Sequence, residues 1–167
     1  MAKIDSQKII GPIMRFVNMR GIIALKDGML AILPLTVVGS LFLIIGQLPF
    51  EGLNQAIASV FGETWTEPFM QVYSGTFAIM GLISCFSIGY SYAKNSGVEP
   101  LPAGVLSLSS FFILLKSSYV PAKGEPIGDA IAKVWFGGQG IIGAIIIGLV
   151  VGAIYTVFIQ RHIVIKM

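Results

Sequence analysis

Residues 134–160, VWFGGQGIIGAIIIGLVVGAIYTVFIQ, contain no charged side chain over 27 consecutive positions. A transmembrane helix needs about 20 largely apolar residues. Three more stretches lack charge, at residues 28–50, 68–93 and 100–115, of which the last is short for a span. This pattern predicts an all-α fold, a polytopic bundle of about four membrane-spanning helices.

The composition agrees with a membrane protein and excludes several other classes. Hydrophobic residues make up 55% of the 167 positions and charged residues only 11%, against roughly 25% charged in an ordinary soluble domain. The mean hydropathy is +0.86. A disordered chain, a nucleic-acid-binding protein and a soluble enzyme with a normal surface are therefore excluded, and the lipid bilayer is the expected environment.

The predicted spans cover residues 29–48, 69–92, 101–120 and 135–160. The third includes Lys116, which has to extend toward the bilayer surface if the segment crosses. A re-entrant hairpin is the alternative for this segment. Together these spans form one membrane part, residues 28–167, which follows an N-terminal segment of different character.

Two further segments have the spacing of amphipathic surface helices. Residues 1–27 form the first, a predicted cytoplasmic helix whose apolar residues recur at i, i+3, i+4 and i+7 (Ile10, Ile13, Met14 and Val17). The second lies between the first two spans and keeps the same periodicity (Leu53, Ala56, Ile57, Val60 and Phe61). We expect this second helix on the opposite bilayer surface, with Trp65 at the interface.

The distribution of lysine and arginine predicts the orientation. With four spans, one side carries eight of these residues and the other side three, Lys116, Lys123 and Lys133. The side richer in basic residues is normally cytoplasmic, so the N-terminus is expected there. A three-span arrangement gives nine against two, and the charge pattern therefore leaves the number of crossings open.

A row of small residues recurs every fourth position in the last span, at Gly140, Ala144, Gly148 and Gly152. Residues four apart lie on one face of a helix, and small side chains there allow another backbone to approach closely. We interpret the row as a helix-packing face, either within this chain or between subunits.

Residues suited to catalysis or metal binding are missing from the predicted spans. The single histidine, His162, has no neighbouring cysteine or carboxylate with which to form a metal or nucleophile set. We therefore assign no catalytic residue, no metal ligand and no cofactor, and whether the chain takes part in catalysis stays open. Ion-driven carriers often place an ionisable group within the bilayer, so if this chain belongs to a transporter, either another segment carries that group or the driving energy enters elsewhere.

Three blocks of the sequence resemble a known family. They are KDGMLAILPLTVVGSLFLIIG at 26–46, FSIGY at 86–90 with PLPAGVLSL at 100–108, and the region from Gln139 to IVIKM at 163–167. In this order they are similar to the N-terminal portion of the membrane (IIC) component of the lactose/cellobiose/diacetylchitobiose branch of the bacterial sugar phosphotransferase system.

The resemblance implies a permease in the bacterial cell membrane that takes up a β-linked disaccharide such as cellobiose, chitobiose or lactose. It implies a homodimer in the full-length protein and soluble IIB and IIA phosphocarrier partners. The sugar-binding residues of the family lie in its second half, so we expect this chain, ending at Met167, to supply scaffold and dimerisation helices and assign it no sugar-binding residue. The alternative is a small membrane scaffold or interaction subunit without transport activity.

Overall fold

The computed structural model describes residues 19–115, 118–119, 127–128 and 131–161. The first 18 residues of the surface helix predicted over residues 1–27, the lysines Lys116 and Lys123, and His162 lie outside this part. The described chain is helical apart from one antiparallel pair of two-residue strands, β1 (Ser118–Tyr119) and β2 (Ile127–Gly128). The predicted all-α class is confirmed.

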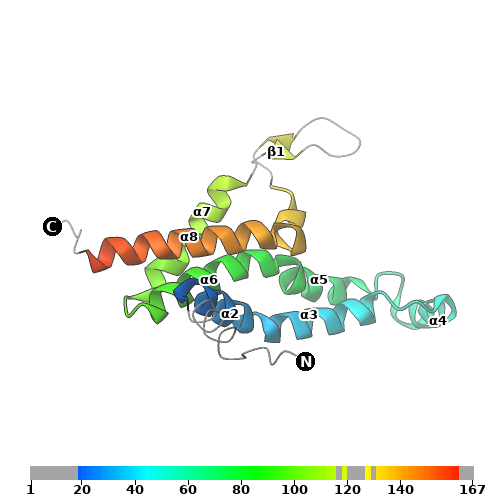
Figure 1. Ribbon diagram of the computed structural model, residues 1–167. Helices are drawn as coiled ribbons and strands as arrows, with labels where there is room; N and C mark the ends of the chain where they lie inside the picture. The colour runs from blue at the N-terminus through cyan, green and yellow to red at the C-terminus, as the bar shows by residue number, and fades with distance from the viewer. Residues whose placement is uncertain (1–18, 116–117, 120–126, 129–130, 162–167) are drawn as a thin grey trace, which may run out of the picture.

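Seven α-helices and three short 3-10 turns make up the described bundle, which is elongated along its helix axes (Figure 1). In chain order they are α2 (Arg20–Ala31), α3 (Leu33–Gly46), α4 (Glu51–Phe61), α5 (Glu67–Gly75), η1 (Phe77–Ile79), α6 (Met80–Asn95), α7 (Pro100–Leu114), η2 (Lys133–Phe136), η3 (Gly138–Gly140) and α8 (Ile141–Gln160).

A long helical hairpin forms one side of the bundle. Its first arm is α2 followed by α3, and its second arm is α5, η1 and α6, with α4 at the tip (Figure 1). The arms run antiparallel, because Gly28, Gly39 and Gly46 approach Ile88, Phe77 and Met70 in that order. The first arm bends at Ile32, where Pro34 occupies the first turn of α3 and cannot donate a backbone hydrogen bond.

The remaining helices pack against α6. Helix α7 runs antiparallel to it, since Ala103 and Ser107 lie near Gly89 and the Sγ of Cys85 contacts the carbonyl of Ser107. Helix α8 runs parallel to α6, and the two end at the same level, where the Nε2 of Gln160 donates a 3.0 Å hydrogen bond to the carbonyl of Ser96. The chain therefore returns along the bundle between the end of α6 and the start of α8.

Three helical stretches are long and apolar enough to cross a membrane by length and composition: Arg20–Gly46, Glu67–Asn95 and Gly138–Gln160. The first begins well before residue 29, and α2 runs across the boundary predicted at residue 27. Helix α7 ends at Leu114, six positions before the predicted limit at residue 120, and Lys116-Ser117-Ser118 follows shortly after in the sequence. At about 1.5 Å per residue, α7 alone is shorter than the hydrocarbon core of about 30 Å.

Candidate functional site: the helix interfaces around α6

The small-residue row of α8 lies on the face that contacts its neighbours. All four of its members, Gly140, Ala144, Gly148 and Gly152, are buried. A Cβ atom at Gly148 would lie 2.9 Å from the carbonyl oxygen of Cys85, and one at Gly152 would lie 2.9 Å from the Cβ of Tyr92. The structure thus places Gly148 and Gly152 against α6 of the same chain.

Gly140 has a different neighbour from the other glycines of the row. A Cβ atom there would overlap the backbone carbonyl of Trp135 and would lie 3.4 Å from the ring of Phe111. Its missing side chain lets the chain fold back tightly just before α8 begins. Ala144, in the next turn, packs with Cys85 and Phe111 in a small buried cluster.

Ile88 occupies the centre of the bundle, fully buried between two glycines. On one side, a Cβ atom at Gly28 of α2 would lie 2.8 Å from both the backbone nitrogen and the Cα of Ile88. On the other side, a Cβ atom at Gly148 of α8 would lie 3.0 Å from the Cβ of Ile88. The side chain of one residue therefore fills the space between three helices.

Helix α7 approaches α6 as closely. A Cβ atom at Gly89 would overlap the hydroxyl of Ser107, and one at Gly104 would lie 2.7 Å from the ring of Phe86. The Ser107 hydroxyl donates instead to the carbonyl of Ala103 at 2.8 Å, within its own helix. The hydroxyl is thereby satisfied in a buried position without weakening the contact between helices.

These contacts make α6 the centre of a rigid assembly. Close backbone approach replaces large interlocking side chains, and in lipid such packing provides much of the attraction between helices. What this arrangement can do is hold the surrounding helices in fixed positions around α6. Among the residues that the structure describes, no three His, Cys, Asp or Glu side chains lie close enough together to hold a metal ion.

Sequence reasoning identified the row on α8 but missed its partners on the other helices. Gly28, Gly89 and Gly104 make equally close contacts. Each lies on a different helix, so no spacing along the sequence connects them. Only Gly89 lies in a region with a sequence signal, the density of small and hydroxyl residues between residues 74 and 91. That density indicates packing inside a bundle but does not say which helix lies opposite.

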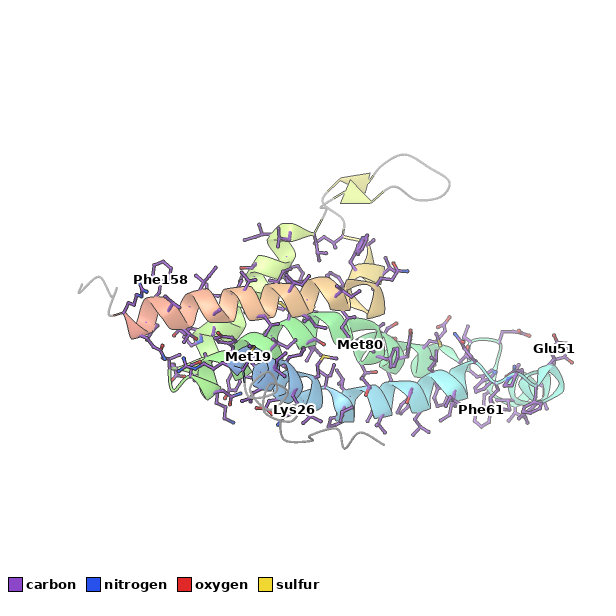
Figure 2. All side chains as sticks on the ribbon, viewed as in Figure 1. Met19, Lys26, Glu51, Phe61, Met80 and Phe158 are labelled. Atoms are coloured by element: carbon purple, nitrogen blue, oxygen red, sulfur yellow. The ribbon has the colours of Figure 1, made fainter. Side chains whose placement is uncertain are left out.

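The outer faces of the bundle are apolar, as expected for helices surrounded by lipid. On α8, Ile142, Ile146 and Ile154 are 69%, 57% and 52% exposed, on the face opposite the glycine row. Val37, Leu41 and Ile44 form a similar surface on α3. Side chains project outward along the bundle in Figure 2, where the α3 and α8 faces are both visible.

A cavity of 310 Å³ opens between α2 and α6 near the end of the bundle that carries Lys94. Asp27 lines this cavity. It accepts a 3.0 Å hydrogen bond from the Nδ2 of Asn95 and lies 3.5 Å from the Nζ of Lys26. Phe86 and Tyr90, stacked with ring centroids 6.1 Å apart, line the same cavity. Two of the sequence blocks that carry the family resemblance therefore meet here.

A bundle of long apolar helices joined by glycine contacts is typical of an integral membrane protein. The sequence model of the family described as "Phosphotransferase system, EIIC" matches residues 26–167. The chain belongs to this family, whose members are membrane permeases of the phosphotransferase system.

Individual relatives agree with the family assignment. The chain is 38% identical to the lichenan permease IIC component of Bacillus subtilis (strain 168), over 99% of this chain and 38% of that protein. It is 36% identical to the cellobiose-specific EIIC component of Geobacillus stearothermophilus, over 92% of this chain and 35% of that protein. This chain thus spans well under half the length of these relatives.

A solved structure shows the same arrangement of helices. ChbC, the IIC component from the N,N'-diacetylchitobiose-specific phosphotransferase system, superposes with a TM-score of 0.85. The two sequences are 32% identical, and the match covers 96% of this chain and 38% of ChbC. Among the more distant relatives, the lactose-specific protein of Staphylococcus haemolyticus (strain JCSC1435) is an EIICB component.

Proposed function

We propose that this chain is the N-terminal scaffold part of a phosphotransferase-system permease for a β-linked disaccharide such as cellobiose, chitobiose or lactose. The observation that carries the proposal is the match to EIIC relatives over nearly the whole chain, together with the 0.85 TM-score against ChbC. The proposed substrate class is supported by the relatives named above, which are permeases for lichenan, cellobiose, N,N'-diacetylchitobiose and lactose.

In this proposal the chain holds the transport machinery and the sugar contacts come from the rest of the permease. The uncharged stretches and the buried glycine contacts around α6 support a structural role. Driving energy enters through IIB and IIA phosphocarrier proteins, which phosphorylate the sugar after it crosses, and the full-length protein acts as a homodimer. The EIICB relatives, in which the B component is joined to the permease, support the partnership with IIB.

The proposed location is the bacterial cell membrane, with several crossings and a cytoplasmic N-terminus. Lys94 and Arg161 lie at the ends of α6 and α8 that share one end of the bundle, and Lys26 lies beside Asp27, which bonds to Asn95 near that end, whereas Lys133 precedes α8 at the other end. The basic end is therefore assigned to the cytoplasm. The antiparallel path of α7 supports a crossing by this segment, and with it the arrangement of four crossings.

Cysteine labelling tests this orientation. Lys94→Cys and Lys133→Cys place thiols at two exposed positions at opposite ends of the bundle. In intact cells a membrane-impermeant maleimide should label position 133, and position 94 should react only after the cells are opened. The native Cys85 is fully buried and serves as the background measurement. Labelling of both positions from the same side would contradict the arrangement.

A chimera tests the transport role. In this experiment, the chain replaces the matching segment of the lichenan permease, and uptake of radiolabelled cellobiose is measured in cells that lack their own permease. We expect uptake that requires phosphoenolpyruvate-dependent phosphorylation, because the helix contacts around α6 are complete within this segment. A chimera that reaches the membrane in normal amounts but takes up no sugar contradicts the proposal, and the unmodified lichenan permease is the control.

A further inference from the structure

Helix α4 leaves most of its apolar side chains exposed. It contains no buried residue, and Leu53, Val60 and Phe61 are 46%, 75% and 76% exposed. With Ala56 and Ile57 they occupy one face of the helix, since residues three and four apart are neighbours on a helix surface. An apolar face of this size is left uncovered by the rest of the described chain.

Part of the polar face of α4 borders the protein, and Gln55 and Ser59 on that face remain exposed. Asn54, Gln55 and Ser59 line a cavity of 390 Å³ together with Gly46, at the end of α3, and Trp65, before α5. The Nδ2 of Asn54 donates a 2.8 Å hydrogen bond to the carbonyl of Leu48 and so fixes the helix in this rotation. A water-soluble protein turns the apolar face of a surface helix inward, whereas α4 leaves Leu53, Ala56, Val60 and Phe61 exposed.

The position of α4 in the chain places it at a bilayer surface. It connects the stretch Arg20–Gly46 to the stretch Glu67–Asn95, both of them candidate membrane spans. Residues 28–50 carry no charge, and at about 1.5 Å per residue they reach across the hydrocarbon core before α4 begins. Figure 1 shows α4 at the tip of this hairpin, far from the end of α6.

An aromatic cluster marks the same level of the molecule. Trp65 contacts Phe69 edge to face with ring centroids 5.9 Å apart, and Phe69 lies 6.0 Å from Phe42 of α3. Tryptophan is enriched where a membrane protein crosses the lipid–water interface. The cluster therefore places the interface beside α4, at the height where its apolar face is exposed.

The charges around α4 restrict the lipid that it fits. Glu51, Glu63 and Glu67 surround the helix, and between Lys26 and Lys94 the sequence contains no lysine or arginine. Surface helices that select anionic lipids do so through basic residues. Attraction at α4 can therefore come only from burial of its apolar face, and negative headgroups would repel its glutamates.

We propose that α4 is an interfacial anchor whose apolar face, formed by Leu53, Ala56, Ile57, Val60 and Phe61, inserts into an electrically neutral lipid surface at the end of the bundle opposite Lys94. The anchor fixes the height of the α3–α5 hairpin in the bilayer. This role is independent of the sugar that the complete permease carries.

Spin labelling of the full chain in liposomes tests the anchor. Val60→Cys and Gln55→Cys form a matched pair, since both positions are exposed on the same helix and lie on opposite faces. In phosphatidylcholine liposomes the label at position 60 should be severalfold more accessible to oxygen and less accessible to a water-soluble nickel complex than the label at position 55. The buried Cys85 provides the background labelling level.

Lipid charge and salt give a second readout. Raising the salt from about 0.1 M to about 1 M shortens the Debye length from about 10 Å to about 3 Å, and should leave the depth of label 60 in phosphatidylcholine unchanged. Adding phosphatidylglycerol should leave it equal or shallower. Deeper insertion with the anionic lipid would overturn the proposal, as would equal nickel accessibility at both positions. Shielding of position 60 from both reagents would identify a protein partner, such as a second copy of the chain, and would also overturn it.

Discussion

Replacing Gly148 with leucine should lower the thermal unfolding temperature of the detergent-solubilised chain. The new Cβ atom alone would lie 2.9 Å from the carbonyl oxygen of Cys85 and 3.0 Å from the Cβ of Ile88. A backbone carbonyl within a helix cannot move aside locally, so α8 has to separate from α6. Overpacking of this kind typically costs about 1–3 kcal/mol, and the loss of close contact along the helix adds to it.

Gly143→Leu is the matched control for this prediction. Gly143 lies on the same helix, five positions earlier, and a Cβ atom there meets no atom within 4 Å. Leucine is also the better helix former, so this variant should unfold at the same temperature as the parent chain or slightly above it. Equal destabilisation by the two substitutions would contradict the assignment of Gly148 to a close interface.

Ile88→Ala should destabilise the chain by a different mechanism, namely loss of the side chain that fills the space between α2, α6 and α8. Ile88 is fully buried, with 0% of its surface accessible. Removing a buried isoleucine side chain typically costs about 2–5 kcal/mol. We expect a clear drop in the free energy of unfolding, measured by titration with a denaturing detergent.

Ile146→Ala provides the comparison, because Ile146 is 57% exposed on the outer face of α8. Its side chain contacts lipid in the bilayer, so shortening it exchanges one apolar environment for another and should cost little. A small effect at both positions would show that the centre of the bundle tolerates a cavity at Ile88. The difference between the two variants measures the contribution of internal packing.

Much of this fold could be predicted from the sequence because a membrane helix is visible there as a long run of residues without charge. The stretch around residues 134–160 predicted α8, and its four-residue spacing predicted that Gly148 and Gly152 share a face. The bend of the first arm has a visible cause in Pro34. Such features depend on one helix alone, which is why a single sequence contains them.

Features that depend on two helices could not be predicted in this way. The break between α5 and α6 follows Thr76, whose hydroxyl donates to the carbonyl of Val72, and no proline signals it. The close approach of Gly28 to Ile88 joins residues 60 positions apart, and no periodicity connects them. For the same reason the sequence predicted an amphipathic helix at the position of α4 without indicating that Asn54 bonds to the carbonyl of Leu48.

The common direction of α6 and α8 has a consequence for biosynthesis. Ribosomes complete α6 well before Gly148 and Gly152 are made, and residues 96–140 must first be synthesised and carried back along the bundle. Helix α6 therefore leaves the translocon before α8 has been made, and the face that α8 covers is exposed until α8 inserts. A ribosome-stalled nascent chain ending before Ile141 should remain sensitive to protease, and a chain long enough for α8 to insert should be resistant.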